Sequence, residues 1–264
     1  MKILEVKNLD VTLKNGNKLI DNISFSLKEN TILGIVGESG SGKSITTKAI
    51  LKLLNGNKFN LSGKILLDGE DIITYSEKQM QKVRGEKISV ILQNPMTSLN
   101  PLTKIGNQMI ETLKFHYKIN KKTAYNMAFD ALLLMNFENV ERVMKSYPYE
   151  LSGGMLQRVV IAITLSLKPK ILIADEPTTA LDVDTRDIII QEILKLKNKF
   201  GISIMYITHE NEIIKNISDE IVVLKNGKII EQGTKEKLIK NPNEQYTKAL
   251  LEEKMDFKEK VKAC

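Results

Sequence analysis

Cysteine, histidine and tryptophan are nearly absent from this 264-residue sequence. It contains one cysteine, Cys264 at the end of the chain, two histidines and no tryptophan. A single cysteine forms no internal disulfide and no cysteine-based metal cage, and two histidines are too few for a dedicated soft-metal site.

Long apolar segments are also lacking. The longest apolar runs, such as residues 159–165, are far shorter than the ~20 residues needed to span a bilayer. The first residues alternate apolar and polar side chains, as a strand does, and lack the apolar core and cleavage site of a signal peptide. With 42% hydrophobic and 27% charged residues, the composition is that of a globular protein. We therefore expect the chain to stay in the cytoplasm.

The formal net charge of +7 does not identify a partner. Lysines are scattered along the chain, without the arginine-rich or aromatic-interleaved cluster of a nucleic-acid-binding surface. We expect no direct contact with nucleic acid. An anionic membrane surface nearby explains the positive charge at least as well.

Short strand-like segments alternate with helical patterns, which indicates an α/β domain. The strands are expected at residues 3–9, 31–36, 64–67, 88–92, 171–174, 203–208, 220–224 and 228–232. Two dipeptides typical of hairpin turns, Asp68-Gly69 and Asn226-Gly227, lie between strand-like runs. The sequence therefore predicts a mixed sheet joined by an antiparallel β element.

The strand pattern stops between residues 95 and 149, where helix-favouring residues dominate. We predict a core formed by residues 1–94 and 156–234, with residues 95–155 inserted into it as a helical subdomain. The last segment, 235–264, is rich in lysine and glutamate and has apolar residues at helical spacing. It is expected to form a C-terminal tail of short amphipathic helices.

A glycine-rich loop lies between an apolar strand and a helical stretch. It reads Gly37, Glu38, Ser39, Gly40, Ser41, Gly42, Lys43 and Ser44. In this context the glycines let backbone N–H groups converge on phosphates at a helix N-terminus, as in a P-loop. Lys43 would bind the β and γ phosphates of ATP, and the Ser44 hydroxyl would bind Mg²⁺. The alternative, a glycine-rich turn that matches by chance, does not account for this context.

Two carboxylates follow the apolar run of residues 171–174. Asp175 and Glu176 would lie at the C-terminal end of a buried strand, the edge where open α/β sheets bind ligands. Asp175 is predicted to bind Mg²⁺, and Glu176 to orient or deprotonate the attacking water. Alone, the sequence Asp-Glu-Pro could be a solvated turn. The P-loop favours the catalytic interpretation.

A second anion site is predicted at Ser152, Gly153 and Gly154, directly before a helical run from residue 156 to 167. The sequence Leu-Ser-Gly-Gly upstream of Asp175-Glu176 resembles the signature motif of ABC ATPases. Three further residues are similar to family motifs: Gln93 to the Q-loop, Asp182 to the D-loop, and His209 to the switch histidine. The resemblance covers nearly the whole chain.

The resemblance to ABC ATPases implies a head-to-tail dimer. In it, Ser152, Gly153, Gly154 and Asp182 of one subunit would complete the site around the MgATP held by the other. Gln93 would contact Mg²⁺, and His209 would contact the γ-phosphate. The helical subdomain would dock on integral membrane subunits.

Two positions depart from the family pattern. Leu13 lies where many family members carry an aromatic residue that stacks on adenine, so the π face is missing at this position. Met155 replaces the glutamine that usually ends the signature motif, which leaves Ser152, Gly153 and Gly154 intact. We expect weaker or less selective nucleotide binding from the first change and little catalytic effect from the second.

Several short segments resemble the peptide and nickel importer branch of the family. They are Gln93-Asn94-Pro95, Ser98-Leu99-Asn100-Pro101, Tyr147-Pro148 and the stretches 45–48 and 145–149. The resemblance implies a peripheral subunit on the cytoplasmic face of the membrane. Its partners would be a homologous ATPase chain, two permease subunits and an extracytoplasmic solute-binding protein. The cargo would be nickel or a metal chelate, with di- or oligopeptides as the alternative.

A different class of function has to be weighed as well. Non-transport ABC ATPases that act on nucleic acid or ribosomes share the same chemistry. They usually carry a long coiled-coil insertion or tandem ATPase domains, and this sequence has neither. A pure nucleotide-binding regulator would be expected to lack Glu176 or His209, and both are present.

Overall fold

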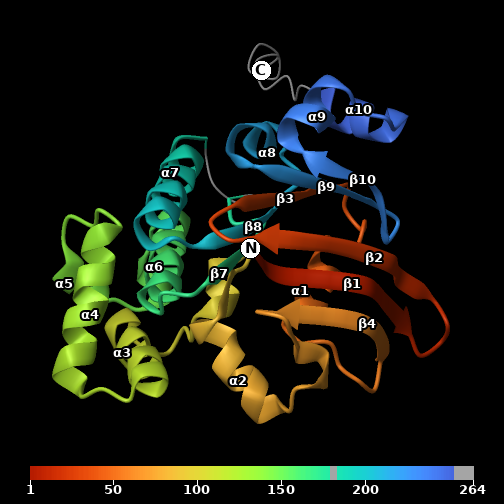
Figure 1. The fold of residues 1–264 in the computed structure, drawn as a ribbon. Helices are drawn as coiled ribbons and strands as arrows, with labels where there is room; N and C mark the ends of the chain where they lie inside the picture. The colour runs from red at the N-terminus through yellow and green to blue at the C-terminus, as the bar shows by residue number, and fades with distance from the viewer. Residues whose placement is uncertain (179–182, 253–264) are drawn as a thin grey trace.

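The computed structural model describes residues 1–178 and 183–252, which form two sheets and a helical lobe (Figure 1). The larger sheet has the strand order β10-β9-β3-β8-β7-β6. Its strands are β3 (Ile32–Val36), β6 (Ile88–Ile91), β7 (Ile171–Asp175), β8 (Ser203–Ile207), β9 (Glu220–Lys225) and β10 (Lys228–Thr234). Neighbouring strands are parallel except β10, which is antiparallel to β9. The predicted mixed sheet is confirmed.

The smaller sheet is antiparallel, with the order β2-β1-β4-β5. It consists of β1 (Lys2–Leu13), β2 (Lys18–Lys28), β4 (Phe59–Leu67) and β5 (Glu70–Asp71). Both predicted hairpins are present, and Asp68-Gly69 and Asn226-Gly227 have the positive φ angles that tight hairpin turns require. Strand β2 is an addition to the sequence prediction, which had no strand in this segment.

A first apolar core fills the space between the two sheets. It contains side chains of β1, β2 and β4 together with one face of the larger sheet and the helix α1 (Lys43–Ile50). The helix α2 (Glu77–Glu86) begins at Ser76, whose side chain forms a capping box with Gln79. Helix α1 is therefore held in place by apolar packing near the C-terminal end of β3.

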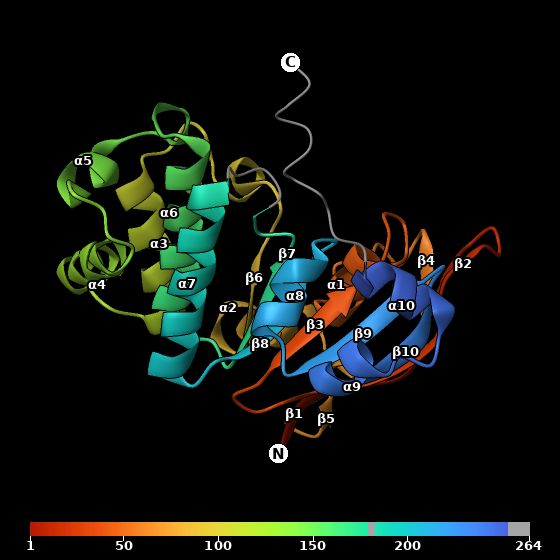
Figure 2. The ribbon, with the colours of Figure 1, turned by 90° about the horizontal axis from the view of Figure 1, so that it is seen from above.

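The helical lobe lies to one side of the larger sheet, as the view from above shows (Figure 2). It contains α3 (Ile105–Tyr117), α4 (Lys121–Leu134), α5 (Val140–Lys145) and α6 (Gly153–Ser166). Asn120 and Asn139 cap α4 and α5 with their side-chain oxygens. The predicted helical subdomain is present. The predicted boundary between residues 155 and 156 lies inside α6, so the helix itself does not mark a boundary there. Its position stays a prediction.

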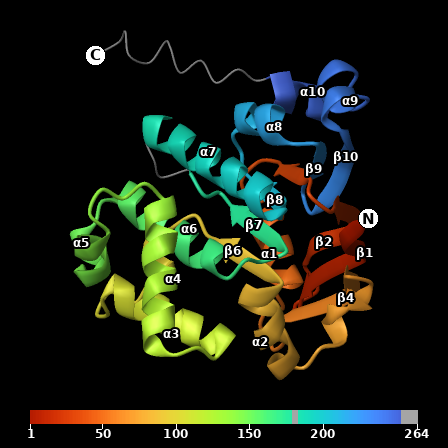
Figure 3. The same cartoon turned by 60° about the vertical axis from the view of Figure 1, so that its left-hand side comes forward.

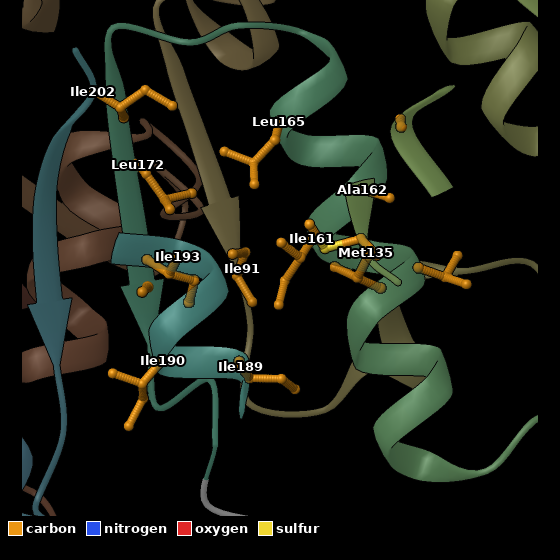
Figure 4. Packing of buried hydrophobic residues seen from close by; sticks show 14 of the residues in the cluster. Ile91, Met135, Ile161, Ala162, Leu165, Leu172, Ile189, Ile190, Ile193 and Ile202 are labelled. Carbon is orange, nitrogen blue, oxygen red and sulfur yellow. The ribbon is translucent and has the colours of Figure 1, made fainter. Parts of the chain in front are cut away.

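Helix α6 joins this lobe to the sheet through a second apolar core. Ile161 and Leu165 of α6 lie close to Ile91 of β6 and Leu172 of β7, and α7 (Val183–Phe200) adds Ile189 and further isoleucines (Figure 4). These side chains are almost fully buried. The N-terminus of α6 is therefore held in a fixed place relative to the sheet.

The C-terminal part of the described chain packs against β9, β10 and the helix α8 (Asn211–Ile217), as Figure 3 shows. It contains α9 (Lys235–Lys240) and α10 (Gln245–Glu252). The carboxylate of Glu231 on β10 accepts hydrogen bonds from the backbone N–H groups of Asn243 and Glu244 at 2.9 and 3.2 Å. Within residues 1–178 and 183–252, no helix is long and apolar enough to cross a bilayer.

The hydrogen bonds to Glu231 predict a pH-dependent contribution to stability. Burial raises the pKa of Glu231, but hydrogen bonds from Asn243, Thr247 and Glu244 outweigh it, so the pKa lies below its ordinary value. We expect Glu231→Ala to lower the free energy of unfolding by about 1–3 kcal/mol at neutral pH. The contribution should be complete above pH ~4.3 and be lost as the pH falls through the lowered pKa.

Urea denaturation at pH 7 and pH 3 measures this effect. The difference between wild type and Glu231→Ala should shrink at the lower pH. Glu111→Ala, at an exposed glutamate on α3, is the matched control and should have little effect at either pH. A pH-independent difference would contradict the role of the ionised carboxylate.

Candidate functional site

At two positions of the loop between β3 and α1, any side chain would clash with neighbouring atoms. Gly37 and Gly42 have φ angles of 157° and 109°. A Cβ atom on Gly37 would lie 2.2 Å from the carbonyl oxygen of Leu224, and one on Gly42 would lie 2.5 Å from Ile20 Cδ1. The tip of the loop, formed by Glu38, Ser39 and Gly40, is exposed, whereas Ser41 is buried. The loop is thus a narrow cradle with an open rim.

Lys43 is held inside this cradle and is only 5% exposed. Its ammonium group donates hydrogen bonds to the carbonyl oxygens of Gly37 at 2.8 Å and Glu38 at 3.0 Å. Burial lowers the pKa of Lys43, while the charges of Glu176 and Asp175 oppose that shift. The ammonium group therefore lies within the loop that the sequence assigns to phosphates.

Asp175 ends β7 and is 8% exposed. Burial raises the pKa of this carboxyl group, and a hydrogen bond from Ser44 opposes the rise. Among the described residues, Asp175 Oδ1 has no hydrogen-bond partner. A buried carboxylate oxygen beside a serine hydroxyl is the kind of oxygen pair that Mg²⁺ prefers, so these residues fit the metal ion of MgATP.

Glu176 directly follows Asp175 and has an unusual backbone conformation. Its φ angle is 50°, in the left-handed region that costs a non-glycine residue roughly 1–2 kcal/mol. Its N–H donates to the carbonyl oxygen of Ile207 at 2.8 Å. Strain of this kind is commonly found at functional sites.

One oxygen of Glu176 is the meeting point of three predicted site residues. Glu176 Oε1 lies 4.0 Å from the ammonium nitrogen of Lys43 and 3.4 Å from Nδ1 of His209. His209 follows β8, and Lys43 begins α1. Four predicted residues, Lys43, Asp175, Glu176 and His209, therefore gather at one edge of the larger sheet.

The residues of the predicted second anion site lie elsewhere. Ser152 caps α6, and its hydroxyl accepts a hydrogen bond from the N–H of Met155 at 3.3 Å. Ser152 and Gly153 are exposed and Gly154 is half-buried. Gln93 follows β6 and is also exposed. Within the described part of the chain, none of these residues forms a hydrogen bond with Lys43, Asp175, Glu176 or His209. Asp182 lies outside the described residues.

Sequence reasoning missed two features near the site. Arg186 on α7 donates a hydrogen bond to the carboxylate of Glu210 at 2.8 Å. Glu210 is the residue directly after His209 in the sequence. Arg186 and Glu210 line a cavity of about 530 Å³ together with Gly37, Glu38 and His209. The sequence held no signal for the ion pair, because its two members are far apart in the chain.

Phe59 is the second missed feature. It begins β4 and pairs in register with Leu13, the half-buried last residue of β1. Directly opposite residues of an antiparallel pair lie on the same face of the sheet. An aromatic side chain is thus present beside the position where the sequence analysis found the π face missing.

The strand–loop–helix unit and the carboxylates at the end of β7 define a P-loop nucleoside triphosphatase. The antiparallel sheet and the helical lobe add the features of an ATP-binding cassette. The chain belongs to the ABC transporter family, which residues 20–179 match. It is therefore an ATP-binding and ATP-hydrolysing protein, and the family resemblance seen in the sequence is confirmed.

Relatives and solved structures agree with this assignment. The chain is 40% identical over 263 residues to the metal-staphylopine import system ATP-binding protein of Staphylococcus aureus, covering 99% of this chain and 97% of that protein. It is 44% identical over 254 residues to an oligopeptide transport ATP-binding protein of Bacillus subtilis, covering 95% and 71%. The fold is similar to cbiO1 from Clostridium perfringens, part of an ABC transporter complex, with a TM-score of 0.77, 28% identity and 90% of both chains covered.

A dimeric ATP-binding cassette in a post-hydrolysis state, bound to ADP and Pi, is a further structural neighbour. Its TM-score is 0.77 at 29% identity, with 88% of this chain and 98% of that chain covered.

The pairing of Leu13 with Phe59 leads to a prediction about nucleotide affinity. If no ring stacks on adenine, Leu13→Tyr should tighten ATP binding by roughly ten-fold, since one base–aromatic stack is worth ~1–3 kcal/mol. If Phe59 already supplies the ring, Phe59→Leu should weaken binding by a similar factor and Leu13→Tyr should add little.

Titration with a fluorescent ATP analogue separates the two cases. Phe115→Leu, on the exposed surface of α3, serves as the matched control. Unchanged dissociation constants in both the Leu13 and Phe59 variants would show that the base lies away from this pair.

Proposed function

We propose that this chain is the ATP-hydrolysing subunit of an ABC importer for nickel or a metal chelate. The observation that carries the hydrolytic part of the proposal is the position of Glu176 Oε1 between Lys43, at 4.0 Å, and His209, at 3.4 Å. A phosphate-binding cation, a carboxylate base and a histidine within reach of one another can hydrolyse a bound triphosphate.

We propose the following roles for the individual residues. The loop from Gly37 to Ser44 would bind the phosphates of ATP, with the buried ammonium of Lys43 as the fixed positive charge. Ser44, Asp175 and Gln93 would hold Mg²⁺, which neutralises phosphate charge when it is bound. Glu176 would take a proton from the attacking water, and His209 would contact the γ-phosphate.

We further propose that the active form is a head-to-tail dimer, with a homologous but different ATPase chain as the partner. The exposure of Ser152 and Gly153 at the N-terminus of α6 supports this arrangement. A capped helix start whose first residues are exposed is suited to bind phosphate oxygens. Together with Asp182, these residues would complete the ATP site of the partner.

The remaining partners are proposed from the relatives. Import systems need membrane components, and we propose two integral membrane permease subunits and an extracytoplasmic solute-binding protein. The chain would work as a peripheral subunit on the cytoplasmic face. In this arrangement residues 1–94 and 156–234 act as the ATPase core, residues 95–155 dock on the permeases, and residues 235–264 form a C-terminal tail.

The proposed cargo rests on the relative that matches almost end to end. The Staphylococcus aureus protein is named for metal-staphylopine import and is covered over 97% of its length. The alternative, di- or oligopeptide import, is favoured by the higher identity of 44% to the Bacillus subtilis oligopeptide protein, of which 71% is covered. In both cases the partner proteins would bind the cargo.

The role of Glu176 gives a direct test of the hydrolytic site. We expect Glu176→Gln to lower kcat for ATP hydrolysis by ~10²- to 10⁴-fold, the usual contribution of a general base. ATP binding should persist, because the loop around Lys43 is unchanged. With its partner chain, the variant should accumulate as an ATP-bound dimer that size-exclusion chromatography detects.

Glu141→Gln, at an exposed glutamate on α5, is the matched control and should keep wild-type turnover. Phosphate release near the wild-type rate by Glu176→Gln would remove Glu176 from the role of base.

Transport in proteoliposomes tests the proposed class and cargo. The chain, its ATPase partner, the permeases and the binding protein should import radiolabelled nickel chelate, with ATP hydrolysis stimulated by the permeases. Uptake of a labelled peptide instead would favour the peptide alternative. Stimulation by DNA or ribosomes, without any response to permeases, would contradict the importer proposal.

A further inference from the structure

The side chain of Gln157 connects helix α6 to the backbone beside Glu176. Gln157 lies on the second turn of α6 and is 1% exposed. Its Nε2 donates a hydrogen bond to the carbonyl oxygen of Pro177 at 2.7 Å. Pro177 directly follows Glu176. The bond therefore joins helix α6, which Ser152 caps, to the segment directly after β7.

The other end of the same amide faces an unusual environment. Gln157 Oε1 is buried and has no hydrogen-bond partner in the part of the chain that the structure describes. A buried acceptor without a partner is unfavourable by ~1–3 kcal/mol, and an apolar side chain of the same length would avoid that loss. Packing alone therefore does not explain a glutamine at this position.

Gln157 also lines a cavity of about 140 Å³ between three functional segments. The cavity is also lined by Gln93 and Asn94, which follow β6, and by Gly153 at the start of α6. Pro177, which lies just after the end of β7, completes this part of the lining. All three segments carry residues assigned above to ATP hydrolysis or lie next to them. A side chain at their junction can hold them in register.

The backbone around Glu176 needs such support. Its left-handed conformation persists only if the neighbouring groups hold it. On one side, the N–H of Glu176 donates to Ile207 at 2.8 Å. On the other side, the carbonyl of Pro177 accepts the bond from Gln157. The strained residue is thus fixed from the sheet on one side and from α6 on the other.

We propose that Gln157 is a positioning residue that sets the carboxylate of Glu176 from helix α6. Through this bond, the position of the N-terminus of α6 at Ser152 and the position of Glu176 in the same subunit depend on each other. The inference rests on the proposed role of Glu176 as the base. It adds a residue that does not touch the nucleotide.

Gln157→Met tests the proposal, because methionine has a similar length and volume but cannot donate to Pro177. We expect kcat to fall by roughly ten-fold, the effect of losing one buried hydrogen bond at the position of the base. The dissociation constant for ATP and the melting temperature should stay close to wild type. Gln157→Asn keeps the amide but is one methylene too short, and it should lose kcat as well.

A role in filling space predicts a different outcome: Gln157→Met would keep wild-type kcat, and Gln157→Asn would lose stability. That result would overturn the proposal. The matched control is Thr164→Val on the same helix, which removes a buried hydrogen bond that stays within α6. It should alter stability more than kcat, and an equal loss of kcat in this control would also contradict a specific role for Gln157.

Glu176→Gln measured in parallel separates the two levels of inference. Loss of hydrolysis in Glu176→Gln with normal kcat in Gln157→Met would remove only the positioning role. Normal hydrolysis in both variants would remove the proposed base, and the positioning role with it.

Discussion

The position of β8 between β3 and β7 is the constraint on which the site depends. Ile207, the last residue of β8, pairs in register with Ile35 of β3 and with Asp175 of β7. The N–H of Glu176 and the carbonyl of Ile207 continue this pairing by one residue. Because the strands are parallel, their carboxyl ends meet, and the P-loop, the two carboxylates and His209 lie at one edge. A slip of one residue in β8 would separate them.

The same edge concentrates buried charge, which must be compensated locally. Lys43 and Asp175 are both almost completely buried, and desolvation shifts the pKa of each toward its neutral form. The charges of Glu176 and Asp175 oppose the lowering of the Lys43 pKa. The hydroxyl of Ser44 and the charge of Lys43 oppose the rise of the Asp175 pKa, whereas the neighbouring carboxylate of Glu176 adds to it. A triphosphate with its metal ion would complete this arrangement of charge, since it supplies anionic oxygens to the ammonium and a cation to the carboxylate.

Sequence reasoning succeeded where the signal is local and failed where it depends on pairing. The P-loop, the turn at Asn226-Gly227 and the cap at Ser152 each lie within a few residues, so their chemistry can be read directly. Strand β2 was missed because Asn22 adopts φ 50° and the β1–β2 pairing contains several register shifts, which break the regular alternation. Ile20 of β2 lies beside Gly42, and the separate pairing of β1 with β4 places Phe59 opposite Leu13. Neither neighbour could be found from the sequence, because both depend on which strands pair and in which register.

Helix α6 shows why a site split between two regions of the chain can act as one. Its apolar face, with Ile161 and Leu165, is buried against β6 and β7, so the helix cannot shift without disturbing that core (Figure 4). Its N-terminus carries Ser152, and Gln157 reaches the carbonyl of Pro177. The same helix therefore has exposed residues at its start and a buried polar contact beside Glu176. Through Gln157, the helix that begins beside Ser152 is thus joined by a hydrogen bond to the residue that follows Glu176.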